Sequence, residues 1–501
     1  MLHPESPVMN TEQASFRTSA TGLVQPDRTL ALLGCAALLA LLAVAWFRFS
    51  YGYVEDDAFI HLEFARSVAR GTGFAFHGTL TNGDTSPLWV LFLAAMHALG
   101  VEWIVAAKLA CVVGLAATVS ATWCLARALP RETPAHDLLP PTAVAITVLN
   151  PYFAHWSFSG MEVTAAVGLS LWALWAVFAG RITLQRAVLA SVLLSLGPLL
   201  RPELLVFAAL VAPVLLWRLW SVGGGSRHRL LLAGGLAVLM LLPLTLWCAY
   251  ALHAFGSVIP NTNLAKRGGA LAQIAAHLAA VYAMGFPATL LLLPAAMIGL
   301  RLGHAPPVIW MLLAWPTACA AFYLADHTAV QTRYCLLSMP TLGIAVLWLL
   351  GRLRQRGWMA GAAAAMLLVS CFEIGWTVIP QVRNKVLGRE RFAVVSAFIN
   401  NHLPPSAPLA IFSIGQIGFE SPHPLVDLGG ITQPDIMPYA GDPAAMLRWA
   451  RARGARYYSA GTPPEPNAVL VFGIRTPYVG WTLQRSQYTQ AGGFLGIYRL
   501  P

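Results

Sequence analysis

The sequence predicts a polytopic α-helical membrane protein with a C-terminal, water-exposed α/β domain. Of its 501 residues, 57% are hydrophobic and only 11% are charged, whereas charged residues make up about a quarter of an ordinary soluble domain. Apolar runs close to the ~20 residues that a spanning helix needs recur along most of the chain. A polar tail of mixed composition follows the last of these runs. Lipid contact must therefore replace the missing polar surface.

Charge and cysteine usage exclude two other classes. The net charge is +11, but the positive residues are dispersed between apolar runs and do not cluster with aromatic residues, as they do in nucleic-acid-binding proteins. All seven cysteines lie inside or at the ends of apolar runs, and no CxxC pair is present. Thiolate metal sites and disulfide redox chemistry are therefore not expected. The first apolar run is too long for a signal-peptide core, so we expect an uncleaved span after a cytoplasmic tail at 1–28.

The apolar runs predict about eleven membrane-spanning helices. Their expected ranges are 29–49, 103–126, 139–156, 161–179, 187–200, 203–220, 230–254, 278–300, 307–325, 334–351 and 357–379. Arginines concentrate in alternate connections, and the positive-inside rule places these and the N-terminus in the cytoplasm. Segment 87–99 is too short to span, and we expect a re-entrant or interfacial helix there. The predicted transmembrane domain is thus 29–379, with a first periplasmic loop at 50–102.

The tail at 380–501 is predicted to form a compact periplasmic α/β domain. Helices are expected at 390–401 and 443–453, and strands at 408–414, 425–428, 468–472 and 494–500. No internal repeat of fixed period is visible. Arginine greatly outnumbers lysine and alanine is abundant, which is typical of a GC-rich bacterium. We therefore expect a multi-pass protein of a bacterial inner membrane, with its tail and active site facing the periplasm.

The first outer loop begins with three consecutive carboxylates, Glu55, Asp56 and Asp57, whose repulsion requires compensation. On a helix, Asp56 and Asp57 point ~100° apart, so that one can face a cavity while the other caps the helix or pairs with an arginine. The adjacent pair could also hold a divalent cation. A solvated acidic helix start, stabilised by the helix dipole, fits the spacing equally well.

Other polar residues gather at the outer ends of the predicted spans. Ionisable groups near membrane depth are costly unless they are paired or functional. The candidate binding residues are Glu55, Asn82, Asp84, Trp89, Arg201, Glu203, Asn261, Lys266, His327, Arg333 and Tyr334, with Glu162 beside them. For each alone, a turn, a headgroup contact or an Arg201–Glu203 structural pair is an alternative. Together they predict an outer-leaflet cavity suited to a phosphate-bearing lipid and a hydroxyl that loses its proton.

Six motifs in chain order carry a family resemblance. They are EDDAFI at 55–60, TNGDTSPLW at 81–89, SGME at 159–162, RPE at 201–203, PNT at 260–262 with AK at 265–266, and RY at 333–334. Together they resemble the GT-C glycosyltransferases, in particular bacterial terminal arabinofuranosyltransferases. The tail motif VDLGGIT at 426–432 resembles the outer domain of that family. The resemblance implies a GT-C-like membrane fold over most of the chain.

The resemblance also implies a reaction. A sugar, arabinofuranose in the family, would pass from a polyprenyl-phosphate donor to a periplasmic glycan, lipid or protein of the cell envelope. Asp56 is the expected base, with Asp57 positioning the acceptor or a cation and Glu162 as a supporting acid. Departures from the family pattern at His61, Glu63 and Asp84 leave the sugar and the acceptor open.

General chemistry agrees with this reaction class. Developing charge on a departing lipid phosphate can be met by Arg201, Lys266 or Arg333, and a carboxylate can take the acceptor proton. A covalent glycosyl intermediate stays open as a second route. A polymerase or ligase of lipid-linked glycans, and a flippase or secondary transporter, are the alternative functions. Transporters commonly show repeated halves and midplane polar breaks, and neither is visible in this sequence.

Overall fold

The computed structural model describes residues 28–220, 225–268, 270–285, 287–328, 330–353, 356–475 and 494–501. The N-terminal helix α1 (Arg28–Ser50) belongs, up to Phe49, to a compact unit of its own. Residues Ser50–Pro501 form the second unit, which contains every other helix and strand. The predicted tail at 1–28 lies outside the described residues except for Arg28, which begins α1.

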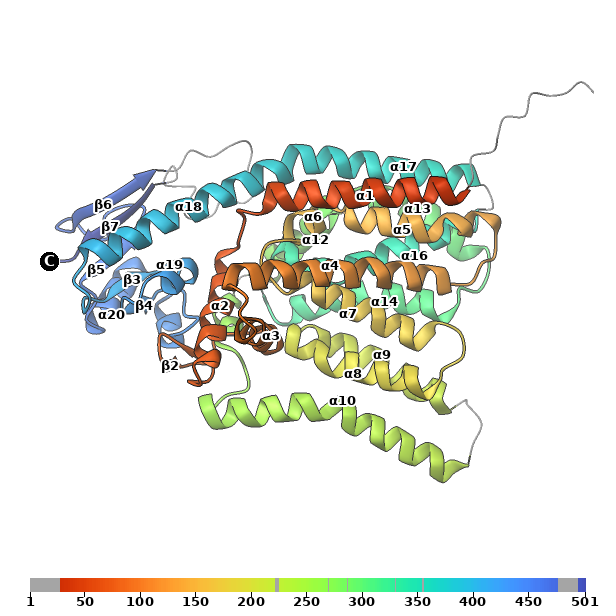
Figure 1. Cartoon of the computed structure of the whole chain (residues 1–501), viewed down its shortest axis with the longest axis horizontal. Coiled ribbons are helices and arrows are strands. Elements are labelled where there is room, and N and C mark those ends of the chain that lie inside the picture. The colour runs from red at the N-terminus through yellow and green to blue at the C-terminus, as the bar shows by residue number, and fades with distance from the viewer. Residues whose placement is uncertain are drawn as a thin grey trace, which may run out of the picture. The chain divides into compact units, whose positions relative to one another are not determined.

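Apolar helices that run alongside one another dominate the second unit (Figure 1). Their bounds are α4 (Trp103–Ala128), α7 (Val163–Phe178), α8 (Leu184–Leu200), α9 (Leu204–Trp220), α10 (Ser226–Phe255), α14 (Pro307–Ala325) and α17 (Arg356–Glu373). Within the described ranges, four helical stretches are long and apolar enough to cross a membrane: 103–128, 226–255, 307–325 and 360–402. The chain is thus a multi-pass membrane protein, and the expected number of about eleven crossings stays a prediction.

Two of the predicted spans are broken helices. Span 139–156 divides into α5 (Leu139–Val148) and α6 (Pro151–Trp156), and span 334–351 into α15 (Thr332–Leu336) and α16 (Met339–Gly351). Helices α12 (Leu271–Gly285) and α13 (Pro287–Arg301) cover the predicted span 278–300 on either side of residue 286, which lies outside the described residues. A proline lies in the first turn of α6 and α16. Proline lacks an amide donor and clashes with the preceding turn, which favours a new helix start over continuation. Periodicity alone does not reveal these breaks.

The first outer loop folds into α2 (Asp56–Ala69), a hairpin of β1 (Ala75–Phe76) and β2 (Thr79–Leu80), and α3 (Pro87–Ala98). Helix α3 coincides with the expected helix at 87–99. Its 12 residues span only ~18 Å, less than the ~30 Å of a bilayer core. This length agrees with the expectation that α3 does not cross the membrane.

The tail is an α/β domain, as predicted. Helix α18 (Ile379–His402) continues α17 through a π-helical turn at Ile374–Val378 and contains the predicted helix 390–401. The sheet has the order β4-β3-β5-β7-β6, with β3 (Leu409–Ile411), β4 (Leu425–Asp427), β5 (Tyr457–Ala460), β6 (Val469–Arg475) and β7 (Phe494–Arg499). Helix α20 (Pro443–Ala452) matches the prediction at 443–453, whereas β5 and the short helix α19 (Gly415–Glu420) were not predicted.

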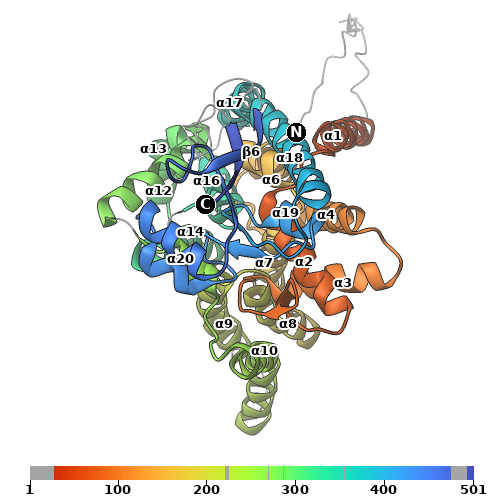
Figure 2. The same ribbon diagram turned by 90° about the vertical axis from the view of Figure 1, so that its left-hand side faces the viewer.

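The α/β domain rests on the first outer loop, with α19 beside α2 (Figure 2). Arg66 of α2 donates to the Phe419 carbonyl at 2.9 Å, and Lys385 of α18 pairs with Glu55 at 2.6 Å. Gly415 is required at the contact, because a β-carbon there would lie 2.0 Å from the carbonyl oxygen of Asp56. The first outer loop is therefore held between the transmembrane helices and the tail.

Candidate active site

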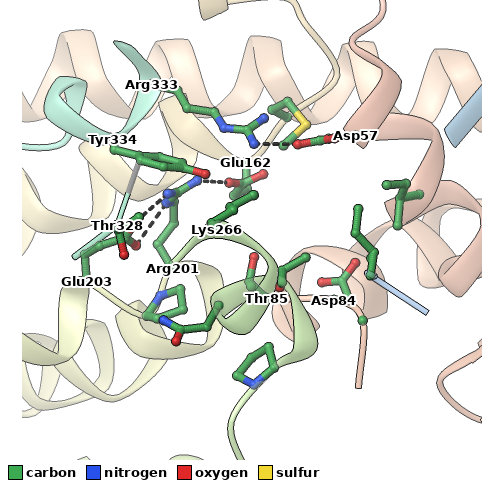
Figure 3. A pocket seen from close by; sticks show the side chains of 18 of the residues that line it. Asp57, Asp84, Thr85, Glu162, Arg201, Glu203, Lys266, Thr328, Arg333 and Tyr334 are labelled. Carbon is green, nitrogen blue, oxygen red and sulfur yellow. Dashed lines mark hydrogen bonds and ion pairs between the residues drawn. The ribbon is translucent and has the colours of Figure 1, made fainter. Parts of the chain in front are cut away.

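A cavity opens where the first outer loop, the outer helix ends and the tail meet (Figure 3). It encloses about 840 Å³, including the solvent at its mouth. Its lining includes eight of the predicted site residues: Asp57, Asp84, Glu162, Arg201, Glu203, Lys266, Arg333 and Tyr334. Segments more than 250 residues apart in the sequence thus contribute to one polar chamber.

Arg201 is fully engaged by two carboxylates. It ends α8 and is 5% exposed. One guanidinium nitrogen donates to Glu162 at 2.7 Å, and two others contact Glu203 at 2.6 and 3.2 Å. Tyr323 donates its hydroxyl to Glu203 at 2.5 Å. A buried ion pair stabilises a protein mainly when its geometry and hydrogen bonds are complete, as they are here. Because two carboxylates neutralise the guanidinium of Arg201, this residue has little positive charge left to attract a ligand.

Arg333 and Lys266 are two further cations of the lining. Arg333 is 2% exposed and pairs with Asp57 at 2.5 Å. The ammonium of Lys266 lies 5.7 Å from the centre of the Tyr334 ring, within reach of a cation–π contact. No carboxylate pairs with Lys266 among the residues that the structure describes. Lys266 is therefore the lining cation most available to pair with an anionic ligand.

His61 links two acidic residues of the lining. Its Nδ1 lies 2.5 Å from Asp84, and its Nε2 lies 3.4 Å from the second oxygen of Glu162. Burial by itself lowers the pKa of His61, but the nearby Asp84 and Glu162 carboxylates outweigh it and raise the pKa to about 10. The imidazole is thus cationic at neutral pH and balances part of the negative charge of the cavity. The sequence marked His61 only as a departure from the family pattern.

The adjacent carboxylates Asp56 and Asp57 occupy different environments. Asp57 lines the cavity, whereas the lining does not include Asp56. The carboxylate of Asp56 accepts hydrogen bonds from the backbone amides of Gln416 at 2.9 Å and Gly415 at 3.4 Å, at the start of α19. The divergence of ~100° that a helix imposes is the reason for this separation.

Their pKa values are shifted in opposite directions. Burial raises the pKa of Asp56 to about 6, and the repulsion of Asp57 and Glu55 adds to it while the Gln416 and Gly415 amides oppose it. Burial also raises the pKa of Asp57, but the attraction of Arg333 and Lys266 outweighs it and holds the pKa well below the ordinary range. Asp57 is therefore ionised at neutral pH.

The remaining predicted site residues lie outside the lining and make contacts around it. Glu55 pairs with Lys385, and Asn82 donates to the Ser257 carbonyl at 3.0 Å. Trp89 is buried and donates to the Gly160 carbonyl at 3.3 Å. Asn261 begins α11 (Asn261–Lys266) and donates to Thr81 and to the Ile431 carbonyl. His327 lies next to α14 with a φ of 52°, and its carbonyl accepts from the Gly268 amide.

Several lining residues were not among the individual candidates from the sequence. Tyr323 lies within an apolar run, which gives no signal of a site. Thr262 and Ile431 belong to the motifs PNT and VDLGGIT, but the motifs alone do not place them at the cavity. Asn263 follows the PNT motif in the same polar stretch. Among the described residues no group of three or more His, Cys, Asp or Glu side chains is arranged to hold a metal.

The fold and the cavity define a class: a multi-pass membrane protein with a polar chamber where the helix ends meet the first loop and an α/β tail. Solved structures are similar to the chain in fold. ArnT from Cupriavidus metallidurans, bound to undecaprenyl phosphate, is 14% identical with a TM-score of 0.59 and covers 93% of this chain and 98% of its own. The arabinofuranosyltransferase AftD from Mycobacteria is 15% identical with a TM-score of 0.52; the match covers 92% of this chain and 40% of AftD.

These similarities confirm the predicted GT-C-like fold. The apo structure of the same ArnT matches equally well, with a TM-score of 0.59 over 94% of this chain. Residues 381–494 match a family model described as a domain of unknown function, DUF8728. No protein with a curated description matches the chain. At these identities the solved structures establish the fold, and the reaction has to be argued from the residues of the cavity.

Proposed function

We propose that this protein transfers a sugar from a polyprenyl-phosphate donor to a hydroxyl of a periplasmic cell-envelope glycan, lipid or protein. The observation that carries the proposal is the chemistry of the cavity. It combines a carboxylate, Asp57, with two cations, Arg333 and Lys266, on a membrane fold shared with a protein solved in complex with undecaprenyl phosphate. Arabinofuranose is the sugar that the family resemblance favours.

The donor phosphate is proposed to bind Lys266 and Arg333. Charge-assisted hydrogen bonds to phosphate oxygens are about twice as strong as neutral ones. Arg333 already pairs with Asp57, so an incoming phosphate competes with that carboxylate for the guanidinium. As the guanidinium turns toward the phosphate, Asp57 loses its main attractive partner and its pKa rises. Donor binding thereby makes Asp57 a better proton acceptor.

The acceptor hydroxyl is then deprotonated by Asp57 as its oxygen attacks the anomeric carbon. The new bond between carbon and acceptor oxygen forms while the bond from that carbon to the phosphate oxygen breaks. The electron pair of the broken bond leaves on the lipid phosphate, where Lys266 and Arg333 stabilise it. One such displacement inverts the anomeric centre. No metal is needed for this balance.

We assign the base to Asp57 in place of the first expectation, Asp56. The support is positional, because Asp57 lines the cavity while Asp56 accepts backbone hydrogen bonds from α19. A base must lie within hydrogen-bond reach of the proton that it removes. Glu162, which pairs with Arg201 through one oxygen and faces His61 with the other, is proposed to orient the sugar through the oxygen that faces His61.

Binding of undecaprenyl phosphate to the purified full-length protein tests the donor site. Lys266→Gln removes a positive charge without breaking a carboxylate pair among the described residues, and we expect about a 10- to 100-fold rise in Kd from the loss of a charge-assisted hydrogen bond. Arg131→Gln is the matched control, because Arg131 is exposed at the opposite end of the helices and pairs only loosely with Asp137, at 3.5 Å. Equal effects of both variants would contradict a phosphate site at Lys266.

Mass spectrometry of the cell envelope tests the reaction itself. Cells that lack the gene should lose one sugar substituent from an envelope glycan, lipid or protein, and the wild-type gene should restore it. If the protein were a flippase or transporter, its loss would instead leave an unflipped lipid-linked intermediate on the cytoplasmic side, and the loss of a polymerase or ligase would change chain length. An unchanged envelope would refute the proposed function.

A further inference from the structure

One segment of the tail reaches the cavity. Ile431, in the turn that joins β4 to the 3₁₀ helix at Pro434–Tyr439, is among the residues that line the chamber. It is the only lining residue from the matched domain of unknown function, within the described part of the chain. The turn at 427–433, called the Ile431 turn below, therefore joins the tail to the proposed site.

The Ile431 turn is rigid by itself. Asp427, 1% exposed, accepts from the amides of Gly429 at 2.8 Å and Thr432 at 2.7 Å, and from the Thr432 hydroxyl at 3.0 Å. Gly430 has a φ of 73°, which favours glycine, and a β-carbon there would lie 2.6 Å from the sulfur of Met437. A side chain carried on such a turn has a fixed position.

Hydrogen bonds tie the Ile431 turn to the membrane part. The side-chain amide of Asn261 donates to the Ile431 carbonyl at 3.1 Å, and the Thr81 hydroxyl donates to the Thr432 carbonyl at 3.2 Å. Gly83 permits close approach, because a β-carbon there would lie 2.8 Å from the Ile431 carbonyl oxygen and 3.3 Å from its side chain. Two outer segments and the tail thus meet at one point.

The chemistry of Ile431 limits what it can contact. An aliphatic side chain packs against the C–H face of a sugar ring but cannot solvate a phosphate. Its neighbour Gly83 precedes Asp84, which faces His61 and thereby Glu162. The phosphate cation Lys266 lies at the other end of α11 from Asn261. Ile431 therefore lies beside the segment that carries Asp84, whose carboxylate faces His61.

Resting on the proposed function, we propose that the domain of unknown function completes the active site. Its Ile431 turn forms the wall against which the transferred sugar or the acceptor packs, and Ile431 is a specificity-determining residue. Asp427 is a positioning residue, which acts by holding the turn. The domain is in this way part of the substrate site and not an appendage to the membrane helices.

The test uses the full-length protein and two readouts: Kd for undecaprenyl phosphate, and the yield of the envelope product that is lost in cells without the gene. In Ile431→Trp the larger side chain occupies space proposed for the sugar or the acceptor, and we expect product yield to fall about tenfold or more. Affinity for undecaprenyl phosphate should change less than about threefold, because the phosphate does not touch the turn. Val469→Ala, at an exposed site on β6 of the same domain, is the control and should match wild type in both readouts.

Ile431→Ala covers the case in which the tryptophan variant does not fold, since it adds no bulk. It should alter product yield or the ratio of products while binding undecaprenyl phosphate normally. Product yields for both folded Ile431 variants equal to that of Val469→Ala would overturn the inference. So would a rise in the Kd for undecaprenyl phosphate as large as that of Lys266→Gln. If the wild type binds no undecaprenyl phosphate, or if deletion removes no product, the proposed function fails instead.

Discussion

The adjacent carboxylates Asp56 and Asp57 have different surroundings and therefore different proposed roles. Asp57 faces the cavity and Arg333, while Asp56 faces the backbone amides that begin α19. Replacing Asp57 with asparagine preserves shape but removes the proposed proton acceptor. We expect kcat to fall about 10² to 10⁴-fold. Undecaprenyl phosphate should bind at least as tightly, because Arg333 no longer has a competing carboxylate. Turnover assays and lipid binding with purified protein measure the two effects.

Asp56→Asn is the matched control for that experiment. The asparagine side-chain oxygen still accepts from the Gln416 amide, so the contact with α19 is largely kept. We expect a much smaller loss of kcat than for Asp57→Asn. If the order is reversed, with Asp56→Asn inactive and Asp57→Asn active, Asp56 is the base and the assignment made from the cavity lining is wrong.

His61 predicts a pH dependence of stability. Its pKa is raised to about 10 by the facing carboxylates Asp84 and Glu162, against the opposing effect of burial. The stabilisation is fully present below the unfolded pKa, ~6.5, and is lost as pH rises through the folded value. Thermal unfolding in detergent should therefore show a Tm that falls between pH 7 and pH 10.5. His61→Gln should lower Tm at pH 7 and flatten this dependence; an equally steep fall in the variant would contradict the ionic role.

At the scale of elements, the contact between α19 and α2 depends on the absence of a side chain at Gly415. A β-carbon there would lie 2.0 Å from the Asp56 carbonyl oxygen, which is backbone and cannot turn away. We expect Gly415→Ala to destabilise the protein by about 1–3 kcal/mol, the usual cost of overpacking. The variant should also become more sensitive to protease at the tail. Thermal unfolding and limited proteolysis provide the measurements.

Gly388, on α18, is the matched control for Gly415. A β-carbon at Gly388 meets nothing within 4 Å, and alanine in a helix interior is more stable than glycine by about 0.5–1 kcal/mol. Gly388→Ala should therefore raise Tm slightly while Gly415→Ala lowers it. Opposite signs would show that the tail is held by close backbone contact, and a neutral Gly415→Ala would show that α19 is not held there.

At the scale of the whole molecule, the arginine asymmetry predicts that the tail lies in the periplasm. A phosphatase fused after Pro501 should be active, because this reporter folds only outside the cytoplasm. A fusion after Pro130, in a connection expected on the inner side, should be inactive. The reverse pattern would invert the predicted orientation and place the proposed cavity in the cytoplasm.

Much of the fold followed from local properties of the sequence. Apolar runs, turn residues and strand alternation predicted the helices around α4, α7 and α14 and most elements of the tail, because these signals depend on neighbours along the chain. Broken helices such as α5 and α6 were missed, since a proline both starts one helix and interrupts an apolar run. Strand β5 was missed because its four residues, YYSA, show no alternation of buried and exposed positions.

For the site, the sequence by itself determined which kinds of group gather at the outer helix ends, because buried charges near a membrane need partners. It identified Asp57, Glu162, Lys266 and Arg333 as candidates, and all four line the cavity. Only the tertiary structure decided between Asp56 and Asp57 for the cavity, and only it brought Ile431 of the tail beside Gly83. The reason is physical: which face of a helix is covered, and by what, depends on contacts between residues more than 300 positions apart, and no local pattern encodes them.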